Sequence, residues 1–271
     1  MPQILFENKK IFYRVEGKER PVLLLHGFAE DGTIWDKQIN ALKENNLLII
    51  PDLPGSGQSE MLDGPRTMKD YAEVVKAIAD EVIFKNEVEN ETQFCLIGHS
   101  MGGYITLAFA EKYPDLLNSF GLFHSSAFAD TEDKKATRRK GIAFIKKNGT
   151  EAFLKTTIPN LFSERTKNEK PEMLTQLLEI GKDISPEALI QYYEAMIQRP
   201  DRTDVLRSFR KPVLFIIGKE DHAVPLQDSL LQCYIPPMSY VHILEKSGHQ
   251  GMWEETQLSN SYLVHFCQNS F

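Results

Sequence analysis

Gly98-His99-Ser100-Met101-Gly102 is the stretch of this chain that decides its fold. Residues 94–97, just before it, are apolar as in a buried strand, whereas residues 103–113 after it have helical spacing. A serine between two glycines at a strand-to-helix turn is typical of a nucleophile on a strained backbone, with the glycines leaving room for neighbouring elements. The start of a helix also favours negative charge beside such a serine. We therefore predict that Ser100 is a nucleophile.

Buried strands and helices alternate on both sides of this turn. Apolar runs typical of strands buried on both faces occur at 22–25, 47–50, 94–97, 120–123, 213–217 and 240–244. Helical segments separate most of them, which predicts an α/β fold: a mostly parallel sheet with helices on both faces.

One long segment interrupts the alternation. From residue 125 to residue 204 no strand-like run occurs, and prolines and glycines divide the segment into amphipathic helical pieces. We predict a core domain formed by residues 1–124 and 205–271, with residues 125–204 as an inserted helical cap. Because sheets of this type bind ligands at the carboxyl ends of their strands, the cap is expected to lie over that edge.

Composition excludes several classes of function. The chain has 271 residues, a formal net charge of −7 and 42% hydrophobic residues. A nucleic-acid partner is not expected, because phosphate contacts require a basic face. No run of about 20 apolar residues and no signal peptide occur, so we expect no membrane partner and a cytoplasmic location. The three cysteines are far apart and lack metal-ligand spacing, so no metal is predicted. The sequence leaves the oligomeric state open.

A serine nucleophile needs a base, and the base needs a group that orients it. His249 lies in a glycine-containing loop between the last strand and the last helix, from which it can reach the centre of the sheet. The run 213–217 is followed by Gly218 and then by Asp221, whose carboxylate is placed to bond the imidazole. Glu220 is the competing residue, since spacing within a turn does not separate neighbours. The order Ser100, Asp221, His249 is the order of α/β-hydrolase triads.

The remaining histidines receive supporting roles. His26 and His99 flank the two key turns, and we expect them to brace those turns. His124 ends a strand, and it is expected either to line the pocket or to contact substrate.

Acyl transfer also requires donors for the negative oxygen of the tetrahedral intermediate. The backbone N–H of Met101, next to the nucleophile, is one predicted donor. The second is the N–H of Phe28, because Gly27 allows the turn after the strand at 22–25 to bend close.

These motifs together resemble the α/β-hydrolase superfamily over nearly the whole chain. The matching segments are His26-Gly27-Phe28, Asp52 to Ser59, Gly98 to Gly103, Gly218 to Asp221, and Gly248-His249. The chain is most similar to the small, capped, cofactor-free branch: carboxylesterases, lactonases, C–C bond hydrolases and haloperoxidase-like perhydrolases. The resemblance implies an eight-stranded sheet and no cofactor. Haloalkane dehalogenases and epoxide hydrolases are set aside, because they use an aspartate nucleophile.

The expected function is serine hydrolysis of a small to medium, largely apolar carboxylic ester or lactone. The apolar side chains expected on the cap are Phe144, Phe153, Leu161, Phe162, Leu177, Tyr192, Tyr193 and Met196. Two alternatives stay open. One is a C–C bond hydrolase of dienoic keto acids, whose anionic substrate requires a pocket cation; the candidates are Arg138, Arg139, Arg165 and Arg199. The other is a ligand-sensing protein of the same fold with little turnover.

Overall fold

The structure, a computed structural model, describes residues 2–85 and 93–270. Eight strands form one sheet in the order β1-β2-β4-β3-β5-β6-β7-β8 within this described part of the chain. The strands are β1 (Gln3–Phe6), β2 (Lys9–Gly17), β3 (Arg20–Leu25), β4 (Asn46–Pro51), β5 (Phe94–His99), β6 (Leu117–Phe123), β7 (Val213–Gly218) and β8 (Ser239–Leu244). Pairing is antiparallel from β1 to β2 and from β2 to β4, and parallel from β4 to β8. The predicted fold class is confirmed.

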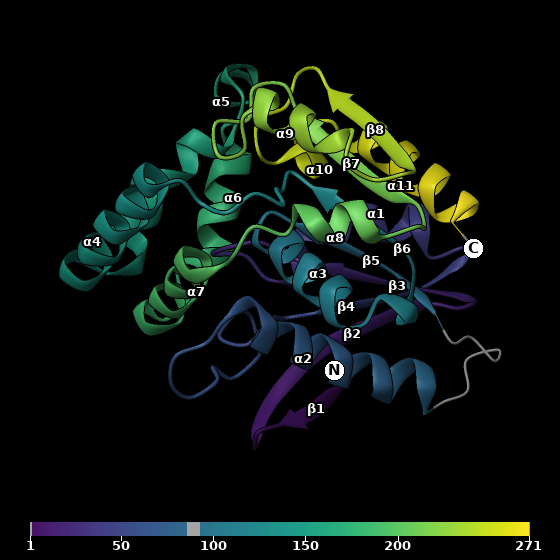
Figure 1. Cartoon of the computed structure of the whole chain (residues 1–271). Coiled ribbons are helices and arrows are strands. Elements are labelled where there is room, and N and C mark those ends of the chain that lie inside the picture. The colour runs from purple at the N-terminus through teal and green to yellow at the C-terminus, as the bar shows by residue number, and fades with distance from the viewer. Residues whose placement is uncertain (1, 86–92, 271) are drawn as a thin grey trace.

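The central strands are buried because helices cover both faces of the sheet. On one side α1 (Asp36–Leu42) packs against α11 (Thr256–Asn269). On the other side α2 (Met68–Ala79) packs against α3 (Met101–Lys112), and α3 also contacts α8 (Thr203–Ser208). Figure 1 shows α2, α3 and α8 along the same side of the sheet. Shorter helices α9 (Leu226–Cys233) and α10 (Gly251–Glu254) complete the core.

The chain between β6 and β7 is helical wherever it is regular. It contains α4 (Glu132–Thr157), which breaks at Gly149 with φ 80°, then α5 (Glu164–Glu169), α6 (Glu172–Gly181) and α7 (Pro186–Gln198). Ser163 and Ser185 cap the starts of α5 and α7 with their hydroxyl oxygens, as expected at helix N-termini. Figure 1 shows α4 and α7 at one end of the molecule, on the opposite side from the C-terminus.

The parallel strands place five connections at one edge of the sheet. The turns after β3, β5, β6, β7 and β8 carry Phe28, Ser100, His124, Asp221 and His249. Because parallel strands end at the same edge, distant segments meet there. Glu30 and Gln250, which are 220 positions apart, are hydrogen-bonded at this edge. Of the helices described, none has both the length and the apolar composition required to cross a bilayer.

Candidate active site

Ser100 occupies a strained turn between β5 and α3. Its backbone has φ 51° and ψ −113°, outside the regions that a non-glycine residue normally adopts. The Ser100 N–H donates to the Phe123 carbonyl at 2.9 Å, which holds the turn against β6. A Cβ at Gly98 would fall on backbone atoms of Gly102, and one at Gly102 would lie 2.7 Å from the His26 carbonyl oxygen. The glycines therefore provide the space that the sequence pattern predicted.

His249 connects the serine to a buried carboxylate. Its Nε2 atom lies 2.8 Å from Ser100 Oγ, and its Nδ1 atom lies 2.8 Å from Asp221 Oδ2. The His249 backbone N–H donates to the Leu161 carbonyl at 2.7 Å, so the segment between β6 and β7 helps to hold the loop. The structure thus brings together Ser100, His249 and Asp221.

Asp221 is held as an anion although it is buried. Its Oδ1 atom accepts the backbone N–H groups of Ala223 and Val224, both at 2.8 Å. Burial raises the pKa of the carboxyl, but the charge of His249 and the contacts with His124 and His249 outweigh burial and hold that pKa well below its usual range. Glu220, the competing residue in the sequence, instead accepts the Glu164 N–H at 3.2 Å and does not contact the imidazole.

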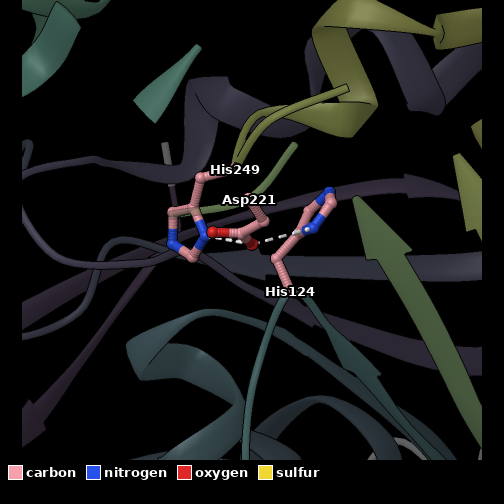
Figure 2. A group of neighbouring side chains, drawn as sticks. All are labelled: His124, Asp221 and His249. Carbon is pink, nitrogen blue, oxygen red and sulfur yellow. Dashed lines mark hydrogen bonds and ion pairs between the residues drawn. The ribbon is translucent and has the colours of Figure 1, made fainter. Parts of the chain in front are cut away.

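His124 is a second histidine on the same carboxylate. Its Nδ1 atom lies 3.3 Å from Asp221 Oδ2, and Figure 2 shows the carboxylate between the His124 and His249 rings. A backbone N–H faces each of its ring nitrogens: the Gly251 N–H lies 3.1 Å from Nε2, and the Gly218 N–H lies 3.1 Å from Nδ1. Burial lowers the pKa of His124 to about 4, which keeps the ring neutral. It is buried and is not among the residues that line the cavity, so the expectation that it lines the pocket is wrong.

The turn after β3 presents Phe28 beside the serine. Ala29 has φ 60°, and a Cβ on Gly27 would lie 2.8 Å from Glu30 Oε2 and 2.9 Å from His99 Nδ1. Among the described residues, neither the Phe28 N–H nor the Met101 N–H donates to a protein acceptor. Both N–H groups predicted as oxyanion donors are thus free of protein acceptors in the described part of the chain.

Glu30 organises this turn, and sequence reasoning did not single it out. Its Oε2 atom accepts the Gly27 N–H at 2.6 Å and contacts His99 Nδ1 at 2.9 Å, while Oε1 accepts from the Gln250 amide at 2.8 Å. His99 Nε2 in turn lies 2.9 Å from the His249 carbonyl oxygen. Glu30 therefore links the turn after β3, the serine turn and the histidine loop. The sequence could have indicated the role of Glu30 only if it were known that these three turns meet.

The charges of this network are coupled. Burial opposes ionisation of both Glu30 and His99, but each stabilises the charge of the other. The result lowers the pKa of Glu30 to about 2 and raises the pKa of His99. His26 meets the expectation for a bracing residue, because its Nε2 atom accepts the Leu53 N–H at 2.8 Å.

A cavity of about 790 Å³ opens beside Ser100 and His249. Of the apolar residues expected on the cap, three line it: Leu161, Tyr193 and Met196. Four others are buried in the core: Phe153, Phe162, Leu177 and Tyr192. Phe144 is 38% exposed. The ring of Phe28 stacks on Tyr193 at 4.3 Å, which joins the turn after β3 to α7.

One group of side chains in the described structure has the composition of a metal site. Ligand atoms of His124, Asp221 and His249 lie within 4.8 Å of one another. The same atoms form the hydrogen bonds described above, so a bound cation would replace the contact between His249 and Asp221. The geometry therefore fits a hydrogen-bonded triad better than a metal centre.

Comparison with known proteins places this arrangement in a family. Residues 20–256 match the alpha/beta hydrolase fold family. A putative carbamate hydrolase, RutD, of Agrobacterium fabrum is 24% identical over 262 residues, covering 93% of this chain and 95% of its own length. A 2-hydroxy-6-oxononadienedioate/2-hydroxy-6-oxononatrienedioate hydrolase of Burkholderia vietnamiensis is 24% identical over 256 residues. The match covers 90% of this chain and 86% of the relative's length. A thermophilic esterase of Thermogutta terrifontis, solved with malate bound, superposes with a TM-score of 0.89 at 27% identity. The superposition covers 97% of this chain and 94% of the esterase chain. The chain belongs to the alpha/beta hydrolase fold family.

Proposed function

We propose that this hydrolase cleaves carboxylic esters, including lactones, through an acyl-enzyme on Ser100. The observation that carries the proposal is the continuous chain of hydrogen bonds from Asp221 Oδ2 through His249 to Ser100 Oγ, each step 2.8 Å long. This is the arrangement in which a serine hydroxyl loses its proton to an oriented base.

In the first step Ser100 Oγ attacks the ester carbonyl carbon while His249 Nε2 takes the hydroxyl proton. The N–H groups of Phe28 and Met101 bind the resulting oxyanion, and Asp221 stabilises the imidazolium. His249 then gives the proton to the departing alcohol, which leaves Ser100 acylated. In the second step His249 activates a water molecule that releases the carboxylic acid and restores the serine. Loss of one oxyanion donor typically costs about 3–4 kcal/mol of transition-state stabilisation.

The proposed substrate is small to medium in size. A cavity of about 790 Å³ lies beside the serine, and Phe28, Leu161 and Met196 give it apolar walls. We assign residues 125–204 the role of a cap over the site, because α4 and the chain after α7 contribute much of this lining.

A C–C bond hydrolase is the second candidate. Two of the arginines named as candidate cations, Arg138 and Arg199, line the cavity. The Burkholderia relative is named for a dienoic keto acid, and that class carries the carboxylates that such cations bind. The same three residues would serve this reaction.

Steady-state hydrolysis of p-nitrophenyl esters from acetate to octanoate tests the proposal, with wild type beside Ser100→Ala. We expect turnover in the wild type and a loss of several orders of magnitude in the variant, with unchanged circular dichroism and melting temperature. The chain-length profile will measure the usable depth of the cavity. Equal activity in both proteins contradicts the proposal. A folded wild type that cleaves a dienoic keto acid but no ester supports the second candidate, and one that only binds ligands supports a sensor.

A further inference from the structure

Three cationic side chains line the same cavity as Ser100. Lys134 and Arg138 lie one turn apart on α4, and Arg199 directly follows α7. The other two candidate arginines lie elsewhere: Arg139 lines a separate surface depression with Glu194, and Arg165 pairs with Glu169 at 3.5 Å. The cations are therefore gathered on one wall of the cavity.

These cations outnumber the buried carboxylates that face them. Asp130, whose side chain is fully buried, accepts from Arg138 Nε at 2.6 Å and from Arg199 Nη2 at 2.9 Å. Lys134 Nζ donates to a neutral acceptor, the Ala223 carbonyl, at 2.9 Å. One carboxylate thus balances one of three positive charges on this wall.

The other ionisable groups around the cavity do not remove the excess. Glu30 is paired with His99. Asp201 and Asp228 are exposed at the rim, where water and salt screen their charge, and His222 is also exposed there. His249 belongs to the triad, and the remaining ionisable side chains are the hydroxyl groups of Tyr104 and Tyr193.

Donor groups on this wall lack acceptors. Arg138 Nη1 donates to no described residue, and the Arg138 side chain keeps 13% of its surface accessible. Arg199 Nε is buried and has no partner within the described structure. A guanidinium with free N–H groups beside a cavity is suited to bind a carboxylate, which accepts two such bonds in parallel.

Two contacts connect the cations to the catalytic residues. Tyr104 lies one helical turn after Ser100 on α3, about 6 Å along the axis, and the Arg199 guanidinium lies 3.8 Å above its ring. On the other side Arg138 lies 5.5 Å from the centre of the Tyr193 ring, which stacks on Phe28. The cationic wall therefore lies within reach of a ligand attached to Ser100.

The pKa of Tyr104, which lines the cavity, is consistent with an excess of positive charge on this wall. Burial raises the pKa of Tyr104, but Arg199, Lys134 and Arg138 together outweigh it, and the net shift is downward. An anion at this position is stabilised.

We propose that Arg138 and Lys134 form a carboxylate subsite, so that the substrates are esters with a second, free carboxylate, such as half-esters of dicarboxylic acids. Asp130 and Arg199 position Arg138 for this contact. The inference rests on the proposed ester hydrolysis and names its substrate class.

The test compares kcat/KM for monomethyl succinate, glutarate and adipate with that for neutral methyl esters of matched chain length. Charge-assisted hydrogen bonds contribute about 1.5–3 kcal/mol, so we expect the anionic series to be preferred by on the order of 10- to 100-fold. Arg138→Gln should abolish most of this preference through KM, and Arg138→Lys should retain part of it. Arg139→Gln, the adjacent arginine outside the cavity, is the matched control and should keep the wild-type ratio.

A second pair of variants keeps the test decisive if Arg138→Gln does not fold. Lys134→Gln should also lower the anionic-to-neutral ratio, whereas Lys135→Gln should not, since Lys135 pairs with the exposed Glu132. Hydrolysis of both series without preference, or equal loss of both in Arg138→Gln and in Lys134→Gln, overturns the subsite and leaves the ester hydrolase standing. Hydrolysis of neither series by the wild type contradicts the proposed function itself.

Discussion

His124 shares the Oδ2 oxygen of Asp221 with the imidazole of His249, at 3.3 Å from its own Nδ1 atom. The Asp221 carboxylate therefore lies between a buried, neutral imidazole and the imidazole of the proposed catalytic base. Because the pKa of His124 is lowered to about 4, this ring adds no competing positive charge beside Asp221 at neutral pH.

This arrangement predicts an acid-sensitive stability. The pKa of His124 is about 4 in the folded protein and 6.5 in its ordinary range, so between these values only the unfolded state binds the proton. The free energy of unfolding should therefore fall as pH falls from 6.5 to 4. The raised pKa of His99 changes the free energy of unfolding above pH 6.5, so the stabilisation from that proton is already complete in this range. The lowered pKa of Glu30 removes further stability below about pH 4.5, so the variant is needed to isolate His124.

His124→Asn should lower the melting temperature at pH 7 but give a shallower decrease between pH 6.5 and 4. His265→Gln, on the exposed face of α11, should keep the wild-type slope. Thermal melts between pH 6.5 and 4 measure how the melting temperature of each variant depends on pH. An unchanged pH dependence in His124→Asn would show that His124 does not cause the loss of stability in acid.

Asp221→Asn should reduce kcat for ester hydrolysis by about 10⁴-fold, because an amide holds the wrong tautomer of His249 and does not stabilise its imidazolium. Glu220→Gln is the matched control, one residue away, and should keep kcat near the wild-type value. Comparable losses in the two variants would mean that the adjacent carboxylates share the role.

Glu30→Gln removes the negative charge that pairs with His99 and weakens the hydrogen bond that holds the turn at Gly27. Breaking a buried ion pair typically costs about 3–5 kcal/mol, so the melting temperature should fall. Small misplacement of the oxyanion donors should reduce kcat roughly 10- to 100-fold. Asp31→Asn keeps its cap on Thr33 and should change neither quantity much. A stable variant with wild-type kcat would remove the organising role of Glu30.

Gly98→Ala should destabilise the protein by more than about 3 kcal/mol, because the added methyl group would fall on the backbone of Gly102. Gly64→Ala provides a control at a glycine with φ +74° and nothing within 4 Å of the added Cβ. There only the left-handed backbone conformation is penalised, by about 1–2 kcal/mol. Chemical denaturation of the two variants compares the costs, and similar values would contradict the steric argument.

Much of the core fold was predictable because its signals are local. Apolar runs buried on both faces mark the parallel strands, and glycines around Ser100 mark a turn that tolerates no side chains. The wrong expectation concerned His124, since its position at a strand end does not show on which side of the strand the ring lies. His26 and His99 were correctly expected to brace turns, but the partner of His99, Glu30, is 69 residues away.

By itself, the sequence determined the alternation of strands and helices, the serine turn and the candidates for the base and the acid, because each depends on neighbouring residues. Only the tertiary structure decided that Asp221 rather than Glu220 meets His249, and that Arg138 faces the cavity while Arg139 does not. Adjacent residues in a turn or helix point in different directions. Their roles depend on which surface packs against them, and that surface comes from distant parts of the chain.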